Sequence, residues 1–108
     1  MSKLPTGLMN KRFCIYILAS KRNGALFIGT TVDLASSVFE HKSNLVPGVT
    51  STYAIHLLVY FEYFEDLISA VSRENSIKSM HRIWKLDLIE QQNPQWRDLY
   101  PEIAGIHC

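Results

Sequence analysis

The chain has 108 residues, which suffices for one domain and leaves no room for two. Hydrophobic residues make up 47% of it and charged residues 19%, values that exclude wholesale disorder. The formal net charge of +1 excludes a strongly basic protein that coats nucleic acids.

The expected location follows from features that the sequence lacks. No apolar run reaches the roughly 18 residues of a membrane span, and the polar residues 1–12 predict no secretory signal. The two cysteines, Cys14 and Cys108, do not have metal-binding spacing and cannot make a disulfide framework. We therefore expect a cytoplasmic protein in a reducing compartment, without a membrane partner.

The first predicted elements are the two strands of a hairpin. Residues 13–18 and 25–29 are β-branched and aromatic runs of strand length, and an Asn-Gly pair between them signals the turn. In this hairpin Tyr16 and Phe27 share one face. The opposite face is the more uniformly apolar, so we assign that face to the core.

The next predicted element is a helix that continues to about residue 43. Leu34, Val38 and His41 recur on one face at helical spacing, and Ser37 lies beside them one turn before His41. A histidine on an apolar helix face is most simply explained by a bond to a carbonyl, and Ser37 by a solvated position.

Residues 55–62 are apolar on both faces, which is typical of a central strand. The helix that follows begins near Asp66, and Glu74 interrupts its apolar stripe. The other members of the stripe are Leu67, Ala70, Val71 and Ile77. A carboxylate there costs several kcal/mol unless it pairs with Lys or Arg, faces a shallow edge or binds a cation.

A third helix is predicted over residues 83–92, where an Asn-Pro pair ends it. Its inward-facing residues are expected to be Trp84, Leu88 and either Leu86 or Ile89. The segment after it is expected to be a tail anchored by Trp96, Leu99 and Tyr100.

This order, β–β–α–β–α–α, indicates an α/β (α+β) fold class with a short, mostly antiparallel three-stranded sheet flanked by helices. We expect residues 1–12 to be a flexible N-terminal tail, residues 13–100 the folded domain and residues 101–108 a C-terminal tail.

Three side chains of this arrangement carry chemistry. Tyr16 and His41 can form a proton-transfer pair, and Glu74 can be the single carboxylate of a metal site, because Mg²⁺ often takes few protein ligands. Taken separately, Tyr16 is equally well a half-buried strand aromatic. The pattern alone leaves both interpretations open.

A family resemblance rests on longer segments. The segment CIYILASKRNGALFIGT resembles the opening of the GIY-YIG nuclease superfamily, with residues 14–16 at the first motif and residues 27–29 at the second, about ten residues on. DLASSVFEH resembles the following helix. AVSRENSIKSMHRIWKLDLIEQQNPQWRDLY resembles the rest of the small stand-alone branch, which is related to the N-terminal nuclease domain of the UvrC excinuclease. The resemblance covers roughly residues 12–100.

The resemblance implies cleavage of DNA phosphodiesters with one divalent cation, Mg²⁺ or Mn²⁺. It assigns the proton of the nucleophile to Tyr16, an assisting role to His41 and the metal to Glu74. A late polar position of the family falls loosely on Asp98 or Asn93.

Two positions depart from the family pattern. The tyrosine of the second motif is Phe27, which cannot carry a proton, and the helix arginine is Ser37, which cannot give a phosphate a fixed bidentate charge. General acid–base help is worth roughly 10²–10⁴ in rate, and one charge stabiliser roughly 10²–10³. We therefore expect a loss on the order of 10⁴ or more unless another cation compensates.

Three interpretations follow from this partly retained set of catalytic positions, which comprises Tyr16, Phe27, Ser37, His41 and Glu74. In the first, the protein binds DNA, branched or damaged, or RNA without cutting it. The basic residues for phosphate contacts are then Lys21, Arg22, Arg73, Lys78, Arg82 and Lys85, with Trp84 available for stacking. The alternative interpretation is that these basic residues only form a solvated face and that Trp84 lies in the core. In the second, the protein is a weak metal-dependent endonuclease of DNA repair or processing; in the third, it is a module for a protein partner.

Overall fold

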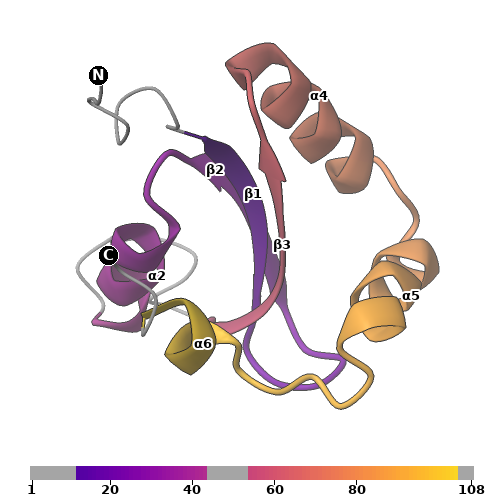
Figure 1. The fold of residues 1–108 in the computed structure, drawn as a ribbon. Helices are drawn as coiled ribbons and strands as arrows, with labels where there is room; N and C mark the ends of the chain where they lie inside the picture. Colours follow the sequence, from indigo (N-terminus) through magenta and orange to yellow (C-terminus); the bar gives the residue numbers. More distant parts are fainter. Residues whose placement is uncertain (1–11, 44–53, 105–108) are drawn as a thin grey trace.

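The structure is a computed structural model, and it describes residues 12–43 and 54–104. Within these ranges the chain forms a three-stranded antiparallel sheet with helices on both sides (Figure 1). The elements are β1 (Phe13–Ala19), β2 (Leu26–Thr31), α2 (Leu34–Lys42), β3 (Leu57–Phe64), α4 (Leu67–Lys78), α5 (Arg82–Gln92) and α6 (Tyr100–Ala104). The expected α+β class and the order β–β–α–β–α–α are confirmed, and α6 follows. None of these helices has the length and apolar character of a membrane span.

The sheet has the order β2-β1-β3, so β1 is the central strand. Tyr16 pairs with Gly29 and Leu18 with Phe27, a register that puts Tyr16 and Phe27 on one face, as predicted. The prediction that residues 55–62 form the central strand is wrong, because β3 lies at an edge of the sheet. Its apolar residues on both faces reflect helices on both faces rather than a neighbouring strand on each side.

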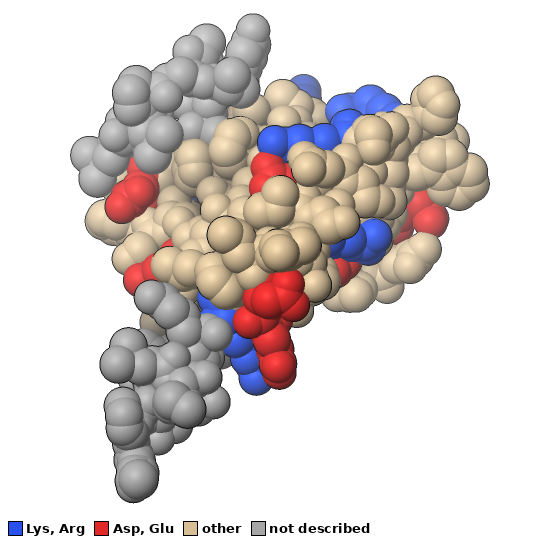
Figure 2. Space-filling view, turned by 90° about the horizontal axis from the view of Figure 1, so that it is seen from above, with Lys and Arg blue, Asp and Glu red and all other residues tan. Residues whose placement is uncertain are grey.

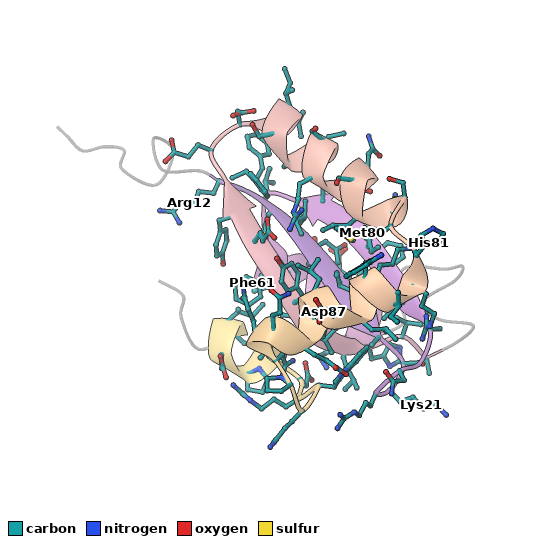
Figure 3. All side chains as sticks on the ribbon, turned by 90° about the vertical axis from the view of Figure 1, so that its right-hand side faces the viewer. Arg12, Lys21, Phe61, Met80, His81 and Asp87 are labelled. Atoms are coloured by element: carbon teal, nitrogen blue, oxygen red, sulfur yellow. The ribbon has the colours of Figure 1, made fainter. Side chains whose placement is uncertain are left out.

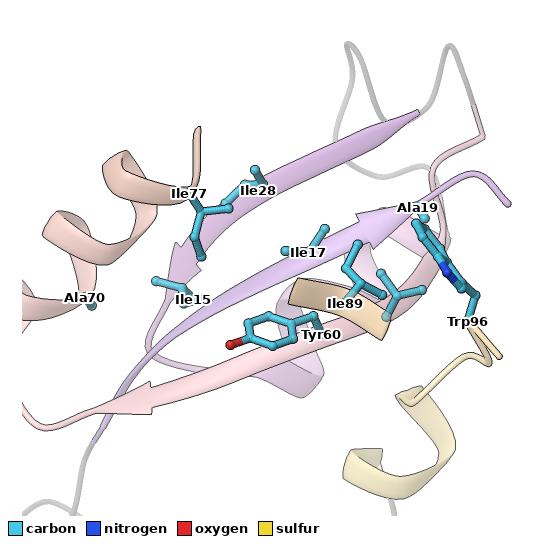
Figure 4. Close-up of a cluster of buried hydrophobic side chains, with 10 residues drawn as sticks. Ile15, Ile17, Ala19, Ile28, Tyr60, Ala70, Ile77, Ile89 and Trp96 are labelled. Carbon is cyan, nitrogen blue, oxygen red and sulfur yellow. The ribbon is translucent and has the colours of Figure 1, made fainter. Parts of the chain in front are cut away.

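Both faces of the sheet are buried, whereas the sequence predicted one core face. On one face, α4 and α5 cover a cluster shown in Figure 4: Ile15, Ile17, Ala19, Ile28, Val59, Tyr60, Ala70, Ile77, Ile89 and Trp96. On the other, α2 and α6 cover a second cluster: Cys14, Tyr16, Leu18, Leu34, Val38, Ile55, Leu58 and Ile103. Figure 1 shows the two helix pairs on opposite sides of the strands. The second cluster contains Tyr16 of the candidate site, whereas Glu74 belongs to α4, on the face of the first cluster.

Aspartate caps begin two of the helices. The side chain of Asp33 accepts a hydrogen bond from the Ser36 amide (3.2 Å), and that of Asp66 accepts one from the Ser69 amide (2.7 Å). The predicted face of α2 is confirmed, because Leu34, Val38 and His41 are its buried residues. In α4 only Ala70 and Ile77 of the predicted stripe are buried, and Leu67 and Val71 are exposed.

The expected inward position of Trp84 is wrong, since this side chain is 60% exposed. The large aromatic of this core is Trp96 instead, which is 3% exposed and donates from Nε1 to Glu90 (2.7 Å). Ile89 is the buried residue of α5. The helix is turned so that Trp84 lies on its outer face.

The segment after α5 is anchored by Trp96, Leu99 and Tyr100, as predicted, and it ends in a further helix. Leu99 donates its amide hydrogen to the Leu58 carbonyl (2.7 Å), and Asp98 accepts from the Leu58 amide (3.0 Å). Residues 101–104, expected in the C-terminal tail, belong to α6, and Ile103 is buried. The predicted tails at residues 1–11 and 105–108 lie outside the described residues.

Candidate functional site

The hairpin brings the tyrosine of the first motif against the glycine of the second. Gly29 faces Tyr16 across the strands, and a Cβ atom on Gly29 would lie 2.9 Å from Tyr16 Oη and 3.1 Å from Phe27 Cε2. Any larger residue would force these two rings to move. Glycine at position 29 therefore allows both aromatic side chains to pack over β2 toward α2.

Tyr16 and His41 form the expected pair. Tyr16 Oη lies 3.3 Å from His41 Nε2, and the two residues are only 4% and 5% exposed. The ring of Phe27 lies 5.0 Å from that of His41, centroid to centroid. The phenyl ring of Phe27 thus packs against His41. The family resemblance expects a tyrosine hydroxyl group at this position.

Burial fixes the protonation of this pair. Burial, together with the negative charge of Glu74, raises the pKa of Tyr16 to about 12. Burial also lowers the pKa of His41; Glu40 opposes that shift and His56 adds to it. At neutral pH the phenol is therefore protonated and the imidazole neutral, so one proton lies between Oη and Nε2.

Ser37 lies where the resemblance places the phosphate-binding arginine. Its hydroxyl is 2.6 Å from that of Thr31, the last residue of β2, and the pair is partly buried. Two neutral hydroxyls bonded to each other carry no positive charge toward a phosphate. Lys42, on the same helix, is paired with Asp98 at 2.5 Å.

Glu74 reaches the same edge of the sheet from α4. Thr30 donates from Oγ1 to Glu74 Oε1, and Lys78 Nζ lies 2.6 Å from Oε2. The Glu74 side chain is 15% exposed and that of Lys78 51%. Burial opposes ionisation of Glu74, but the bonds from Lys78 and Thr30 outweigh it and lower the pKa. The carboxylate on the apolar stripe is thus satisfied by a lysine, one of the predicted alternatives.

The donor set does not fit a resident divalent cation as the side chains stand. The described residues contain no group of three or more His, Cys, Asp or Glu side chains that could hold a metal ion. Glu74 is the carboxylate at the site, and each of its oxygens already accepts from a donor of this chain. Neither Thr30 nor Lys78 was singled out as its partner from the sequence, although Lys78 follows Glu74 by the four residues typical of a helical ion pair.

The six predicted nucleic-acid-binding residues fall into two groups. Arg73 pairs with Glu62 (Nη2 to Oε2, 3.0 Å), and Lys78 pairs with Glu74. The other four lie at the hairpin loop or the start of α5: Lys21, Arg22, Arg82 and Lys85.

Arg82 joins the hairpin loop to α5. Its Nη2 donates to the carbonyls of Asn23 (2.8 Å) and Gly24 (2.7 Å). In Figure 3, Lys21 projects outward at the lower right, below the start of α5, which His81 marks. The face seen in Figure 2 carries Lys and Arg interspersed with Asp and Glu, so it offers no surface of a single sign. The loop and the start of α5 are therefore the better candidates for a phosphate contact.

The candidates for the late polar position act on the edge of β3. Asn93 Nδ2 donates to the carbonyls of Val59 (3.2 Å) and Arg97 (2.9 Å). Asp98 accepts from the Leu58 amide and pairs with Lys42. These bonds hold the segment after α5 beside the strand.

Comparison with known proteins adds the following similarities. A family model described as the GIY-YIG catalytic domain matches residues 12–87. The UPF0213 protein CPE1444 of Clostridium perfringens is 34% identical over 89 residues, which are 82% of this chain and 95% of that protein. The UPF0213 protein SH2523 of Staphylococcus haemolyticus is 32% identical over 78 residues, 72% of this chain and 94% of that protein. The solution NMR structure of the UPF0213 protein BH0048 from Bacillus halodurans is 23% identical with a TM-score of 0.49, over 76% of this chain and 86% of that chain.

Proposed function

The chain belongs to the GIY-YIG family, and from that premise we propose that it is a nuclease-like protein that binds nucleic acid and has lost most or all of its cleavage activity. The observation that carries the proposal is the hydroxyl pair of Ser37 and Thr31 at the place of the phosphate-binding arginine. Phe27 supports it, because a phenyl ring against His41 can neither move a proton nor polarise a water molecule.

The proposed phosphate contacts are made from the hairpin loop and the start of α5. Lys21 and Arg22 are exposed there, and the bonds of Arg82 to the loop carbonyls keep the loop beside the helix. Trp84, exposed on the same helix, offers a ring on which an unpaired base can stack. DNA and RNA both present this combination of phosphates and bases.

A binding titration tests the proposal. We compare the native chain with a Lys21→Gln/Arg22→Gln variant on DNA and RNA oligonucleotides across a salt series. Each lost phosphate contact should reduce the slope of log affinity against log salt by about 0.9 on duplex DNA. Arg97→Gln is the control, because Arg97 pairs with Glu102 of α6, away from the hairpin loop. Absence of binding by the native chain at low salt would contradict the proposal and favour a protein partner.

A weak endonuclease is the second candidate, and the retained Tyr16–His41 pair favours it. Family nucleases use a divalent metal ion, so branched, nicked and linear DNA are incubated with Mg²⁺ or Mn²⁺ at low salt. We expect no cleavage by the native chain. Cleavage that Glu74→Ala abolishes would establish this second candidate. Cleavage only by a Phe27→Tyr/Ser37→Arg variant would show that the geometry survives and the chemistry was lost.

A further inference from the structure

The carboxylate of Glu74 is enclosed by donors of its own chain. Lys78 Nζ approaches Oε2 at 2.6 Å, and Thr30 donates to Oε1. Glutamate and lysine four residues apart, with the glutamate first, form the favourable orientation of a helical ion pair. The cluster of these three side chains therefore has no net charge when Glu74 is ionised.

We propose that the Lys78 ammonium takes the place of a divalent cation at Glu74 and is the residue that decides which cation this site accepts. The inference rests on the proposed function, in which the Glu74 site does not run metal-dependent cleavage. The native chain then binds divalent metal ions weakly. Removal of Lys78 alone turns Glu74 into a metal ligand.

Charge and coordination chemistry support this assignment. A divalent ion on Oε2 would lie within a few ångströms of the ammonium group, and the two like charges repel each other. Mg²⁺ loses its water reluctantly and needs a net attraction to do so, which a neutral cluster does not supply. Tyr16 of β1, on which the charge of Glu74 acts, is also neutral at pH 7 and does not restore that attraction.

The exposure of the two side chains makes Lys78 separable from the fold. Lys78 is 51% exposed at the last turn of α4, whereas Glu74 is 15% exposed against the sheet. Replacement of Lys78 thus leaves the packing of α4 in place, and Glu74 keeps its bond from Thr30. The site after the substitution carries one negative charge.

Mn²⁺ binding to the protein alone tests the proposal, measured from the electron paramagnetic resonance signal of the free ion. Lys78→Met should bind Mn²⁺ about tenfold or more tighter than the native chain, as expected for removal of a like charge about 5 Å from a dication in water. Lys85→Met is the matched control on α5 and should bind as the native chain does. Lys78→Met/Glu74→Gln should lose the gain.

Two results would overturn the inference: native binding as tight as that of Lys78→Met, or no gain in either Lys78→Met or Lys78→Gln. The glutamine variant guards against a folding defect of the methionine variant, and circular dichroism checks both. No nucleic acid is present in the titration, so its outcome is independent of the binding test of the proposed function.

Discussion

At the scale of single residues, the candidate site depends on close packing as much as on chemistry. Gly29 admits Tyr16 because it has no Cβ, and Tyr16 in turn reaches His41 across the second core cluster. The pair that resembles catalytic machinery is therefore also part of the core. A substitution at the second motif should change stability before it changes any reaction.

We predict that Gly29→Ala destabilises the protein by about 1–3 kcal/mol, because its Cβ would lie 2.9 Å from Tyr16 Oη and 3.0 Å from Cζ. Urea denaturation measures the cost. Tyr16→Phe removes the nearer atom, so in the double variant the cost of Gly29→Ala should fall. Equal costs in both backgrounds would show that Tyr16 is not the obstacle.

At the scale of elements, the edge of β3 depends on the segment that follows α5. Asp98 accepts from the amides of Leu58 (3.0 Å) and Tyr100 (3.1 Å) and pairs with Lys42. It thereby joins a strand, a helix and the approach to α6. The carboxylate gives one edge amide of β3, that of Leu58, the acceptor that a fourth strand would otherwise have supplied.

We predict that Asp98→Ala costs about 1–3 kcal/mol, because it leaves the buried Leu58 amide without an acceptor. Glu102→Ala is the matched control: its pair with Arg97 is exposed, and its loss should cost about 0.5 kcal/mol or less. Denaturation midpoints in urea give both values. Similar losses for the two variants would mean that the amide finds another acceptor.

At the scale of the whole molecule, the two core clusters share β1, whose residues alternate between them. The buried imidazole of His41 lies beside Tyr16 of the second cluster, and burial lowers the pKa of His41. Near the ordinary pKa of histidine, global stability should therefore depend on pH through His41. The group is neutral in the folded chain at pH values where it begins to take up a proton in the unfolded chain.

The sign follows from linkage. Above the ordinary histidine pKa of about 6.5, both states are neutral and the stability is full; it is lost as the pH falls through the lower folded pKa. We expect the native chain to lose stability from pH 7.5 to 5.5, at no more than about 1.4 kcal/mol per pH unit from one proton. His41→Gln should flatten this dependence, measured by urea midpoints. His81→Gln, which removes an exposed histidine, should retain the native slope.

The hairpin and its register could be predicted because the Asn-Gly turn and the alternation of residues are local signals. Asn23 has a φ of 58°, the left-handed conformation that this pair favours. The exposed position of Trp84 could not be predicted from the sequence. Periodicity along α5 does not reveal that Trp96, in the segment after this helix, fills the core instead. The edge position of β3 was missed because two buried faces produce the same apolar run in an edge strand as in a central one.

The candidate site was predictable in part for similar reasons. Tyr16 and His41 were paired through the order of strand and helix, and the structure places them together. The partners of Glu74 and Ser37 are Thr30 and Thr31 of β2. These contacts depend on side-chain rotamers, which the spacing of residues along the sequence does not reveal. The roles of these residues in binding or cleavage stay predictions.

The alternation of β1 between two cores also limits how this family member can change over generations. Insertion of a single residue within β2, between Leu26 and Phe27, would move Phe27 to the α4 side and Ile28 to the α2 side, so that β2 would present the wrong side chain to each core. An insertion of two residues there would keep both side chains on their faces. Lineages that descend from this chain can therefore vary the loop beside Lys21 and Arg22 freely, whereas β2 tolerates an odd insertion only where a bulge absorbs it.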